Sequence, residues 1–532
     1  QEFKVWLYQL SRLSIISEES PQFYLIEPER DFALIISNRN FETVEGVDLK
    51  KRRGSETNLK LWENLIKGFG YSVEAYEDIT AAGILEKVKN MAKKINDHQS
   101  SSSFVCYIET HGDKGKLYGS DSKSIDLKEV TDAFKEINCP GLRGKPKLFF
   151  IEASAISHGG KCDYLNDSEF RSRLDPAEPH FLNAISLAPE SASFKSEEDG
   201  TWITDVFVKI FKNHYKDQDV CSMLLKVNDY ASKAHAKNGY KQPCQLVFTT
   251  TKIVKFSSAA GSDVKKIEGT EKQNEKAQLP CDDKYWCYPM ENKNGVAVVI
   301  NVERFNKKNG KESELGDREG SEREAKKLKE FWRELGFAVK EPSDTTSQGI
   351  SNFLQMVADE INKQQNSNCF VCCIMTHGHL GEIYGSDNLP VKIEYILDIF
   401  KEDKCPALAG KPKLFFIQAC RNQEPEVMGA SASAASNASE NSVFLARKIN
   451  PHEIDFLIGF STLPGQDSHR DEKGGSWYME ALVEIFQKYY KEEDILSLMT
   501  RVNRKLVNDK HSKQCPAPVI TLTRKFYFRS SA

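Results

Sequence analysis

Apolar residues occur along this chain in two patterns that alternate with one another. Short runs rich in β-branched and aromatic residues, such as FALIIS and GVAVVIN at 295–301, have the length of buried strands. Between the runs, apolar residues recur at helical spacing, as at Trp62, Leu65, Ile66 and Phe69, which indicates one face of an amphipathic helix. Strands that alternate with helices predict an α/β fold, a mostly parallel central sheet with helices on both faces.

The whole pattern occurs twice. The segment KPKLFFI begins at 145 and at 411, and YGSD begins at 118 and at 384, so both pairs have an offset of 266 residues. Farther along, Trp202 and Trp477 are 275 residues apart, so the second copy carries nine extra residues before this point. Two copies of one long pattern indicate a duplicated domain rather than a solenoid of short repeats.

The patterns also suggest where each copy begins and ends. We expect the first copy at 22–256 and the second at 288–532, after an N-terminal helical segment at 1–21 that resembles the tail of a further domain. Residues 257–287 are polar and lack apolar periodicity, which predicts a linker. The stretch GASASAASNASENS, inside the second copy, predicts a flexible loop.

Composition excludes several classes of protein. The chain of 532 residues has a net charge of −4, which gives no reason to expect binding to nucleic acid or to a membrane surface. It has no apolar run long enough for a transmembrane helix. Its 13 cysteines are an odd number without regular spacing, which favours free thiols in a reducing, cytoplasmic compartment over a disulfide framework. None of the spacings predicts a metal site.

Two reactive side chains of the second copy follow predicted strands. His377 follows FVCCIMT and Cys420 follows KLFFIQA, and α/β proteins bind ligands where parallel strands end. A thiol and an imidazole at this edge can form a Cys/His pair, with the backbone amides of Gly378 and Cys420 as oxyanion donors. The pattern alone leaves a plainer alternative open, because a lone cysteine at a strand end is more often a small core residue.

The motifs around these residues resemble those of caspases, which are cysteine endopeptidases that cleave after aspartate. The resemblance extends over about 294–528, and it rests on THGHLGEIYGSD, KPKLFFIQAC, STLPGQDSHRDEKGGSW and RVNRK. It implies that Cys420 is the nucleophile and His377 its acid/base partner. It also implies that the chemistry needs no metal and no cofactor.

The resemblance further implies a pocket for the aspartate of the substrate. Its residues are Arg318, Gln418 and Arg470. A guanidinium suits this role because it stays charged and binds a carboxylate through two parallel hydrogen bonds. Taken singly, two loop arginines and a strand-end amide are ordinary residues, but together they favour the pocket.

Some positions depart from the family pattern. Asn422 stands where a glycine is usual, so the backbone after the cysteine is expected to differ. Asp467 and His469 stand where executioner-type members commonly have aromatic residues, so we expect an unusual preference for the residue next to the cleaved Asp. We expect His379 to be a surface loop residue outside the site.

The family pattern also suggests how the chain is processed. It divides the second copy into a large subunit, an intersubunit loop and a small subunit, expected at about 288–423, 424–446 and 447–532. The stretch 421–454 contains no aspartate, so cleavage of this loop after Asp is not expected. The candidate processing sites lie instead in the linker, at Asp263, Asp282 and Asp283.

The first copy has lost part of the same residue set. It keeps His111 and Arg52, but it has Ser154, Glu152 and Lys195 in the places of the nucleophile, the pocket glutamine and the second pocket arginine. A serine hydroxyl is a weaker nucleophile than a thiolate, and Glu152 puts a negative charge where a carboxylate would bind. We therefore expect a FLIP-like pseudo-caspase; a serine hydrolase is the alternative.

Together these patterns predict an Asp-directed cysteine endopeptidase that acts on protein substrates in apoptosis or innate immune signalling. The first copy would regulate the second, as the partner in an intramolecular pseudo-heterodimer, because a flexible linker of this length spans roughly 30 Å. Alternatively, the copies are merely tethered, or the first copy is a decoy that binds another caspase, or the protein forms a caspase dimer. The alternative function is a non-catalytic regulator or decoy that binds and modulates other caspases.

Overall fold

The computed structural model describes both copies, with gaps between the described ranges. The N-terminal segment, the intersubunit loop, nearly all of the predicted linker, Asn422 and the candidate processing residues Asp263, Asp282 and Asp283 lie outside the described residues. The described ranges are 23–27, 31–44, 49–98, 101–113, 115–155, 178–188, 194–196, 200–234, 244–257, 286–290, 295–306, 315–421, 454–471, 475–509 and 514–528.

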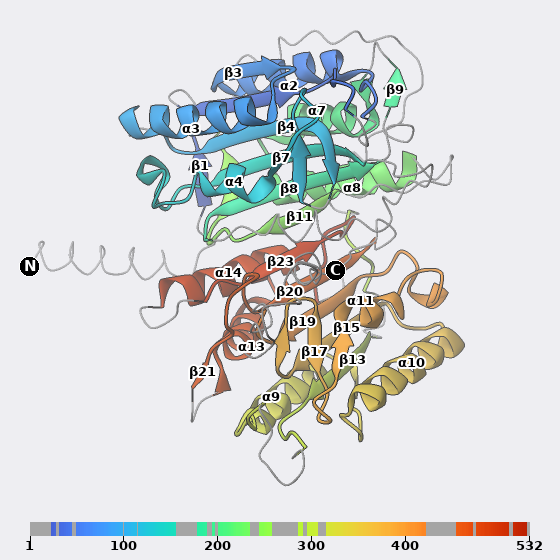
Figure 1. The fold of residues 1–532 in the computed structure, drawn as a ribbon. Helices are drawn as coiled ribbons and strands as arrows, with labels where there is room; N and C mark the ends of the chain where they lie inside the picture. The colour runs from blue at the N-terminus through green and yellow to red at the C-terminus, as the bar shows by residue number, and fades with distance from the viewer. Residues whose placement is uncertain are drawn as a thin grey trace, which may run out of the picture.

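The first copy is drawn in blue to green in Figure 1. Its strands are β1 (Phe23–Ile26), β2 (Phe32–Ser37), β3 (Ser72–Glu77), β4 (Phe104–Asp113), β5 (Lys116–Tyr118), β6 (Ser124–Asp126), β7 (Lys147–Ala155), β8 (Phe181–Ala188), β9 (Phe194–Ser196), β10 (Gly200–Thr201), β11 (Gln245–Phe248) and β12 (Ile253–Phe256). Its helices are α2 (Ser55–Phe69), α3 (Ala81–His98), α4 (Leu127–Asp132), α7 (Trp202–His214), α8 (Val220–Ala234) and the 3₁₀ turn η2 (Pro140–Leu142).

The second copy is drawn in yellow to red. Its strands are β13 (Gly295–Asn301), β14 (Ala338–Lys340), β15 (Cys369–Met375), β16 (Gly378–His379), β17 (Glu382–Tyr384), β18 (Pro390–Lys392), β19 (Lys413–Gln418), β20 (Phe456–Phe460), β21 (Arg470–Asp471), β22 (Gly475–Ser476) and β23 (Ala517–Ile520). Its helices are α9 (Ser321–Glu334), α10 (Ser347–Gln364), α11 (Ile393–Asp398), α13 (Trp477–Tyr489), α14 (Ile495–Asn508) and the 3₁₀ turn η8 (Pro406–Leu408).

Each copy has a mostly parallel sheet, as the sequence pattern predicts, with five parallel strands followed by one antiparallel strand. The order is β3-β2-β4-β7-β8-β11 in the first copy and β14-β13-β15-β19-β20-β23 in the second. The side chains of α2, α7 and α8 pack on one face of the first sheet, and those of α3 and α4 pack on the other. In the second copy α9, α13 and α14 cover one face, and α10 and α11 cover the other. This confirms the α/β fold with helices on both faces.

The predicted helix faces are buried as expected. In α2, the residues Trp62, Leu65, Ile66 and Phe69 all point into the core, because a 3.6-residue period brings them to one side of the helix. None of the helices in the described ranges is both long and apolar enough to span a lipid bilayer.

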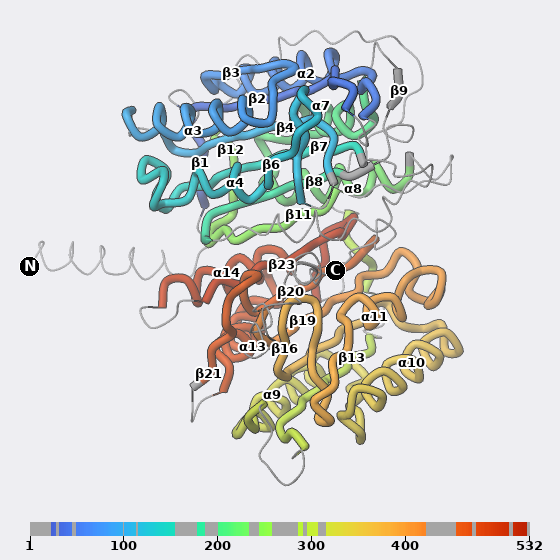
Figure 2. Tube along the Cα trace, in the orientation of Figure 1, coloured from blue at the N-terminus to red at the C-terminus, as the bar shows by residue number. Residues whose placement is uncertain are grey.

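The two copies share one continuous sheet. Strand β11 pairs with β23 in antiparallel register, with Leu246 opposite Ile520 and Val247 opposite Val519. Figures 1 and 2 show these strands side by side at the junction of the copies. One hydrophobic cluster continues across the junction on the face that carries α8 and α14. The last strand of each copy is therefore not a free sheet edge.

Side-chain contacts repeat across this junction with approximate two-fold symmetry. Asn228 of α8 donates a hydrogen bond to the carbonyl oxygen of Leu522, at 3.1 Å. Asn503 of α14, its counterpart, donates to the carbonyl oxygen of Thr250, at 3.4 Å. Each asparagine thus satisfies a buried backbone acceptor in the other copy, as expected of an isologous interface.

Candidate active site

Neighbouring strands bring His377 and Cys420 together at the carboxyl ends of the strands in the second sheet. Strands β15 and β19 are adjacent and parallel, and their last paired residues are Met375 and Gln418. The Thr376 amide continues the pairing by donating to the Gln418 carbonyl oxygen, at 3.1 Å. His377 and Cys420 each lie two residues beyond that last pair, so strand pairing brings together residues that are far apart in sequence.

Gly378 lies against the backbone next to the cysteine. A Cβ atom at this position would come within 2.9 Å of the Ala419 Cβ and 3.3 Å of the Cys420 carbonyl oxygen. Only glycine permits this close approach without displacing one of the two segments. The backbones of Gly378 and Cys420, whose amides are the expected oxyanion donors, are therefore neighbours.

The position of His379 differs from our expectation. Its side chain is only 7% exposed, and its ring stacks on Tyr384 with the ring centroids 5.4 Å apart. Its Nε2 lies 3.4 Å from a carboxylate oxygen of Glu382. The prediction of a surface loop residue is wrong because His379 lies in β16, directly opposite Glu382 in a short hairpin.

Cys420 differs from the core cysteines of the second copy. Cys372, for example, is fully buried, whereas Cys420 is a half-buried free thiol. The Ser468 amide donates a hydrogen bond to its sulfur, at 3.5 Å. Burial and the neighbouring Asp467 carboxylate raise the pKa of the Cys420 thiol, while the Ser468 amide and Arg318 act in the opposite direction. The partial exposure favours a reactive thiol over a core residue.

His377 is held in one tautomer. Its Nε2 lies 2.7 Å from the carbonyl oxygen of Gly316, which can only accept, so Nε2 carries the proton and Nδ1 keeps its lone pair. The ring also packs on Phe305, with the centroids 5.0 Å apart. Burial lowers the pKa of His377, and the positive charges of Arg318 and Arg470 lower it further. These effects outweigh the opposing hydrogen bond to Gly316 and favour the neutral imidazole, which can accept a proton at Nδ1.

The two predicted pocket arginines lie near one another, and one of them, Arg470, is incompletely paired. Arg318, 4% exposed, donates to Asn301 Oδ1 and to the Val302 carbonyl oxygen, at 3.2 and 3.1 Å. Arg470 donates to the Glu319 carbonyl oxygen at 2.7 Å, and its buried Nη1 has no hydrogen-bond partner among the described residues. Burial lowers the pKa of Arg318 to about 10, and the charge of Arg470 contributes. Two such guanidiniums suit an anion.

Gln418 belongs to a polar network that the sequence did not reveal. Its amide donates to Ser468 Oγ at 2.6 Å, and the same hydroxyl lies 2.9 Å from Ser461 Oγ. Gln514, from the segment before β23, donates to the Ser461 carbonyl oxygen at 2.6 Å and accepts from the His469 amide at 2.9 Å. These bonds fix the segment that runs from β20 past Cys420.

Glu324 is another residue near the site that the sequence analysis did not identify. It lies on α9, 3% exposed, and accepts hydrogen bonds from the amide and the hydroxyl of Ser476. A side chain at Gly475, which has a φ of 116°, would overlap the Glu324 carboxylate. Burial raises the pKa of Glu324, and the nearby Arg318 and Arg470 oppose that rise. Glu324 thus explains the Gly-Ser pair of the Gly-Ser-Trp motif, and its charge lies close to the pocket arginines.

In the first copy, two carboxylates of the protein itself pair with Arg52, the counterpart of Arg318. Arg52 is 2% exposed, with Nη1 at 3.2 Å from Glu109 and Nη2 at 3.6 Å from Glu152. Its Nε donates to Ser154 Oγ at 2.9 Å. The structure therefore brings together the predicted residues Arg52, Glu152 and Ser154, but in an ion-pair cluster whose own carboxylates already neutralise the arginine.

Glu109 was not predicted, although the repeat contains the signal for it. An offset of 266 aligns Glu109 with Met375, so an acidic residue replaces an apolar one at the end of the same strand. Glu109 is fully buried and also accepts hydrogen bonds from Ser55 and Asn58, at 2.8 and 2.9 Å. The first copy has therefore gained one more pocket change than our comparison of motifs found.

His111 is also unsuited to act as a base. Its Nε2 lies 2.7 Å from the Lys50 carbonyl oxygen and its Nδ1 lies 3.2 Å from the Ser154 carbonyl oxygen. Burial lowers its pKa to about 4, and the charge of Arg52 adds to this effect. Both ring nitrogens thus face backbone oxygens rather than the Ser154 hydroxyl. The backbone of Lys195 lies in β9, and its side chain is outside the described part of the chain.

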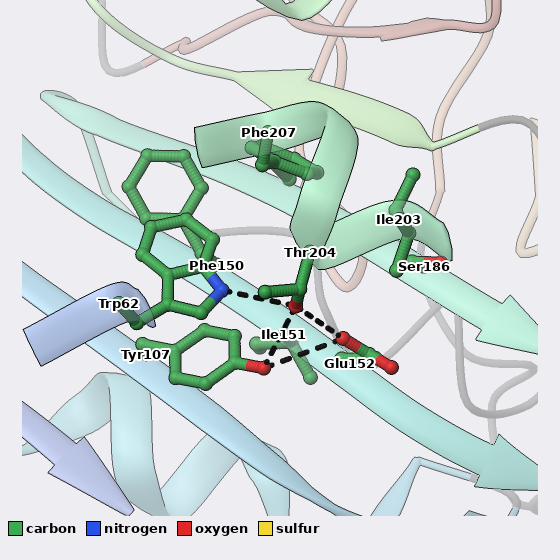
Figure 3. Close-up of a pocket in the computed structure, with 10 residues that line it drawn as sticks. Trp62, Tyr107, Phe150, Ile151, Glu152, Ser186, Ile203, Thr204 and Phe207 are labelled. Atoms are coloured by element: carbon green, nitrogen blue, oxygen red, sulfur yellow. Dashed lines mark hydrogen bonds between the residues drawn. The ribbon is translucent and has the colours of Figure 1, made fainter. Parts of the chain in front are cut away.

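The other side of Glu152 faces a polar network in the core of the first copy (Figure 3). Thr204 and Tyr107 donate to its Oε2 at 3.0 and 3.3 Å, and the Trp62 indole N–H donates to Thr204 at 3.2 Å. Burial, with a contribution from the charge of Glu109, raises the pKa of Glu152 to about 7. The single positive charge of Arg52 cannot neutralise two buried carboxylates.

This cluster predicts a pH-dependent stability. Because the pKa of Glu152 is raised in the folded state, its contribution is fully favourable below pH 4.5 and is lost as the pH rises to about 7. Glu152→Gln removes the excess charge, so we expect its thermal unfolding midpoint to exceed that of the wild type by about 3 °C at pH 8 and to match it at pH 5.

Differential scanning calorimetry at the two pH values measures this difference. Glu86→Gln, on the exposed side of α3, is the matched control and should change neither midpoint. Equal destabilisation by Glu152→Gln at both pH values would contradict the prediction, because it would mean that Arg52 binds Glu152 as a stable anion.

Comparison with known proteins identifies the family. The sequence model of the caspase domain matches residues 30–255 and again residues 294–527. Caspase-7 of Gallus gallus is 35% identical over 245 residues, which are 44% of this chain and 77% of that protein. Caspase-3 of Mus musculus is 34% identical over 244 residues, 44% of this chain and 83% of that protein. Caspase-8 of Rattus norvegicus is 33% identical over 257 residues, 45% of this chain and 52% of that protein.

The comparisons agree with the repeat in the sequence and with the two equivalent sheets. The two matches to the caspase domain together cover most of the chain, and each of these relatives aligns with less than half of it. The chain is a member of the caspase family, with two caspase domains in tandem.

Proposed function

We propose that the second copy is a cysteine endopeptidase that cleaves protein substrates after aspartate, and that the first copy is a non-catalytic partner. The observation that carries this proposal is the neighbouring pair of guanidiniums, Arg318 and Arg470, near the half-buried Cys420 thiol and His377, with a buried nitrogen of Arg470 that has no partner among the described residues. A carboxylate side chain satisfies these cations, and the bond that follows it then lies at the thiol.

The residues support an acyl-transfer mechanism. His377 accepts the thiol proton at Nδ1, and the Cys420 sulfur attacks the carbonyl carbon of the substrate aspartate. The amides of Gly378 and Cys420 stabilise the negative oxygen of the tetrahedral intermediate. His377 then returns its proton to the leaving amine, which frees the new N-terminus, and water hydrolyses the thioester to release the acid.

The contacts of the first copy support a non-catalytic role for it. Ser154 is bound by Arg52, and His111 faces backbone oxygens, so no nucleophile–base pair is present in this cluster. The pairing of β11 with β23 supports an intramolecular pseudo-heterodimer, in which the first copy takes the place that a second subunit has in a caspase dimer. The proposed role in apoptosis or innate immune signalling, the cytoplasmic location and processing at Asp263, Asp282 or Asp283 follow from the family resemblance.

A second candidate function is a non-catalytic regulator or decoy that binds other caspases. The observation in its favour is the surroundings of the thiol, because the Asp467 carboxylate and burial both disfavour the Cys420 thiolate. Under this alternative the second copy binds Asp-containing segments without cleaving them.

Hydrolysis of short reporter peptides by the intact chain distinguishes the two candidates. We expect turnover of a reporter ending in Asp, at a kcat/KM about 10³-fold above that of its uncharged Asn analogue, because the two guanidiniums lose their charged partner in the analogue. A reporter ending in Arg should not be cleaved. Equal turnover of the Asp and Asn reporters would contradict the pocket assignment, and binding of an Asp peptide without turnover would favour the regulator.

A further inference from the structure

We propose that Asp467 selects substrates that carry a basic residue, lysine or arginine, immediately before the aspartate that is cleaved. This inference rests on the proposed endopeptidase function and names the substrate class of the same site. It depends on where the segment around Asp467 lies relative to Cys420, on how firmly that segment is held, and on the charges on either side of the thiol.

The segment that contains Asp467 runs alongside the nucleophile. The Gly465 amide donates to the Arg421 carbonyl oxygen at 2.7 Å, and the Arg421 amide donates to the Gln466 carbonyl oxygen at 3.1 Å. The Ser468 amide donates to the Cys420 sulfur at 3.5 Å. The residues on both sides of Asp467 are therefore bonded to residues 420 and 421, which places Asp467 beside the thiol.

The backbone of this segment is fixed although the Asp467 side chain is exposed. Ser468 Oγ is bonded to Gln418 and Ser461, and the His469 amide is bonded to Gln514. The Asp467 carboxylate also lies within hydrogen-bonding reach of the Cys420 thiol. Since it is held on a fixed backbone, it can accept a further hydrogen bond from a substrate cation with little additional ordering of the protein.

Strand order shows on which side of the cleaved bond Asp467 lies. In the sheet, β19 has β15 on one side and β20 on the other, so Cys420 lies between His377 and the segment after β20. His377 must reach the leaving amine, which places the residues after the cleaved bond on the β15 side. The residues before the bond then extend along the β20 side, where Asp467 lies.

Alternation of side chains directs the neighbouring residue away from the arginine pocket. Successive side chains of an extended peptide point to opposite sides. When the aspartate binds the buried Arg318 and the half-buried Arg470, the residue before it points outward, toward the exposed surface that carries Asp467. The site thus has two arginines for the substrate aspartate and the Asp467 carboxylate for the residue before it. This carboxylate favours a positively charged side chain.

A matched set of reporters tests the proposal. The peptides differ only in the residue before the aspartate, which is Lys, its uncharged analogue norleucine, or Glu. For the wild type we expect kcat/KM for the Lys peptide to exceed that for the Glu peptide by about tenfold at low salt, and the ratio to shrink at high salt. Asp467→Asn should bring the ratio close to one, and Asp467→Lys should invert it.

Asp403→Asn, an exposed change elsewhere on the second copy, is the control and should keep the wild-type ratio. A change of the same factor for all three peptides in Asp467→Asn, with a pH–rate profile displaced to lower pH, would overturn the proposal, because Asp467 would then act on the thiol alone. So would a charge preference confined to the residue after the bond. If the wild type cleaved none of the Asp reporters, the proposed function itself would fail, and this inference with it.

Discussion

Replacing Cys420 with alanine is expected to lower kcat/KM for Asp reporters by at least about 10⁴-fold, because no other group can form the acyl intermediate. Replacing Ser154 with alanine, at the equivalent position of the first copy, should leave kcat/KM unchanged. Ser154 Oγ lies in the Arg52 ion-pair cluster and has no imidazole nitrogen aimed at it. The pair of variants thus separates the two copies by their chemistry.

Initial rates for the two variants and the wild type measure this effect, at a temperature at which all three proteins are folded. Circular dichroism verifies the folding, which matters for Ser154→Ala because it removes a buried hydrogen-bond partner of Arg52. A comparable loss of activity in both variants would contradict the assignment, since it would give the first copy a catalytic role. Full activity in Cys420→Ala would exclude the proposed nucleophile.

A charged residue in β23, the strand that joins the second copy to the first, should cause the second-largest loss of activity. Val519 of β23 is 3% exposed and lies opposite Val247 of β11. Val519→Asp places an unpaired carboxylate in this buried contact, at a cost of several kcal/mol. We expect the activity against Asp reporters to fall at least about 100-fold, because β23 also pairs with β20, the strand that leads into the segment with Ser468 and Arg470.

Rates and hydrodynamic size together test this prediction. The wild type should behave as a monomer of 60.3 kDa, because both joining strands are already paired within one chain. Ala338→Asp, in the exposed outer strand β14, is the control and should keep full activity. If Val519→Asp kept normal folding and normal rates, the pseudo-heterodimer would have no catalytic importance.

A milder variant keeps the test informative if Val519→Asp does not fold. Asn503 and Arg504 donate to the carbonyl oxygens of Thr250 and Thr251 in the first copy, at 3.4 and 2.8 Å. The double change to alanine removes these bonds without charging the strand, and we expect about a tenfold loss of activity. Unchanged activity in a folded double variant would argue against coupling between the copies.

Local patterns in the sequence were sufficient to predict the sheets and the edge that carries the site. The strand-length runs before His377 and Cys420 are local patterns, and the offset of 266 shows that both copies share them. Local apolar patterns of this kind predict strands directly. Glu324 was missed because its partner, Ser476, is 152 residues away. The role of Ser468 likewise depends on strand β20 returning past Cys420. His379 was misplaced because a short hairpin, rather than a loop, follows Gly378.

Pairing of the two copies was predicted from the family resemblance, but composition and periodicity do not specify the strands that join them. Strands β11 and β23 look like any buried edge strands, and nothing in QLVF or APVI specifies a partner. Pairing depends on the geometry of the whole sheet edge and on Asn228 and Asn503, whose hydrogen-bond partners in the other copy are 294 and 253 residues away.

The symmetry of that junction has a consequence for how it can evolve. In a homodimer every substitution appears on both sides of the axis at once, whereas here each side is inherited separately within one gene. Asn228 and Asn503 still make the same contact, but the next residues are Asp229 and Arg504. Asp229 lies 4.0 Å from Arg524, and Arg504 bonds to the backbone of the first copy. Covalent linkage therefore fixes the ratio of the two copies at one to one. It also allows the two sides of the junction to change independently, as the proposed division into a non-catalytic and a catalytic copy requires.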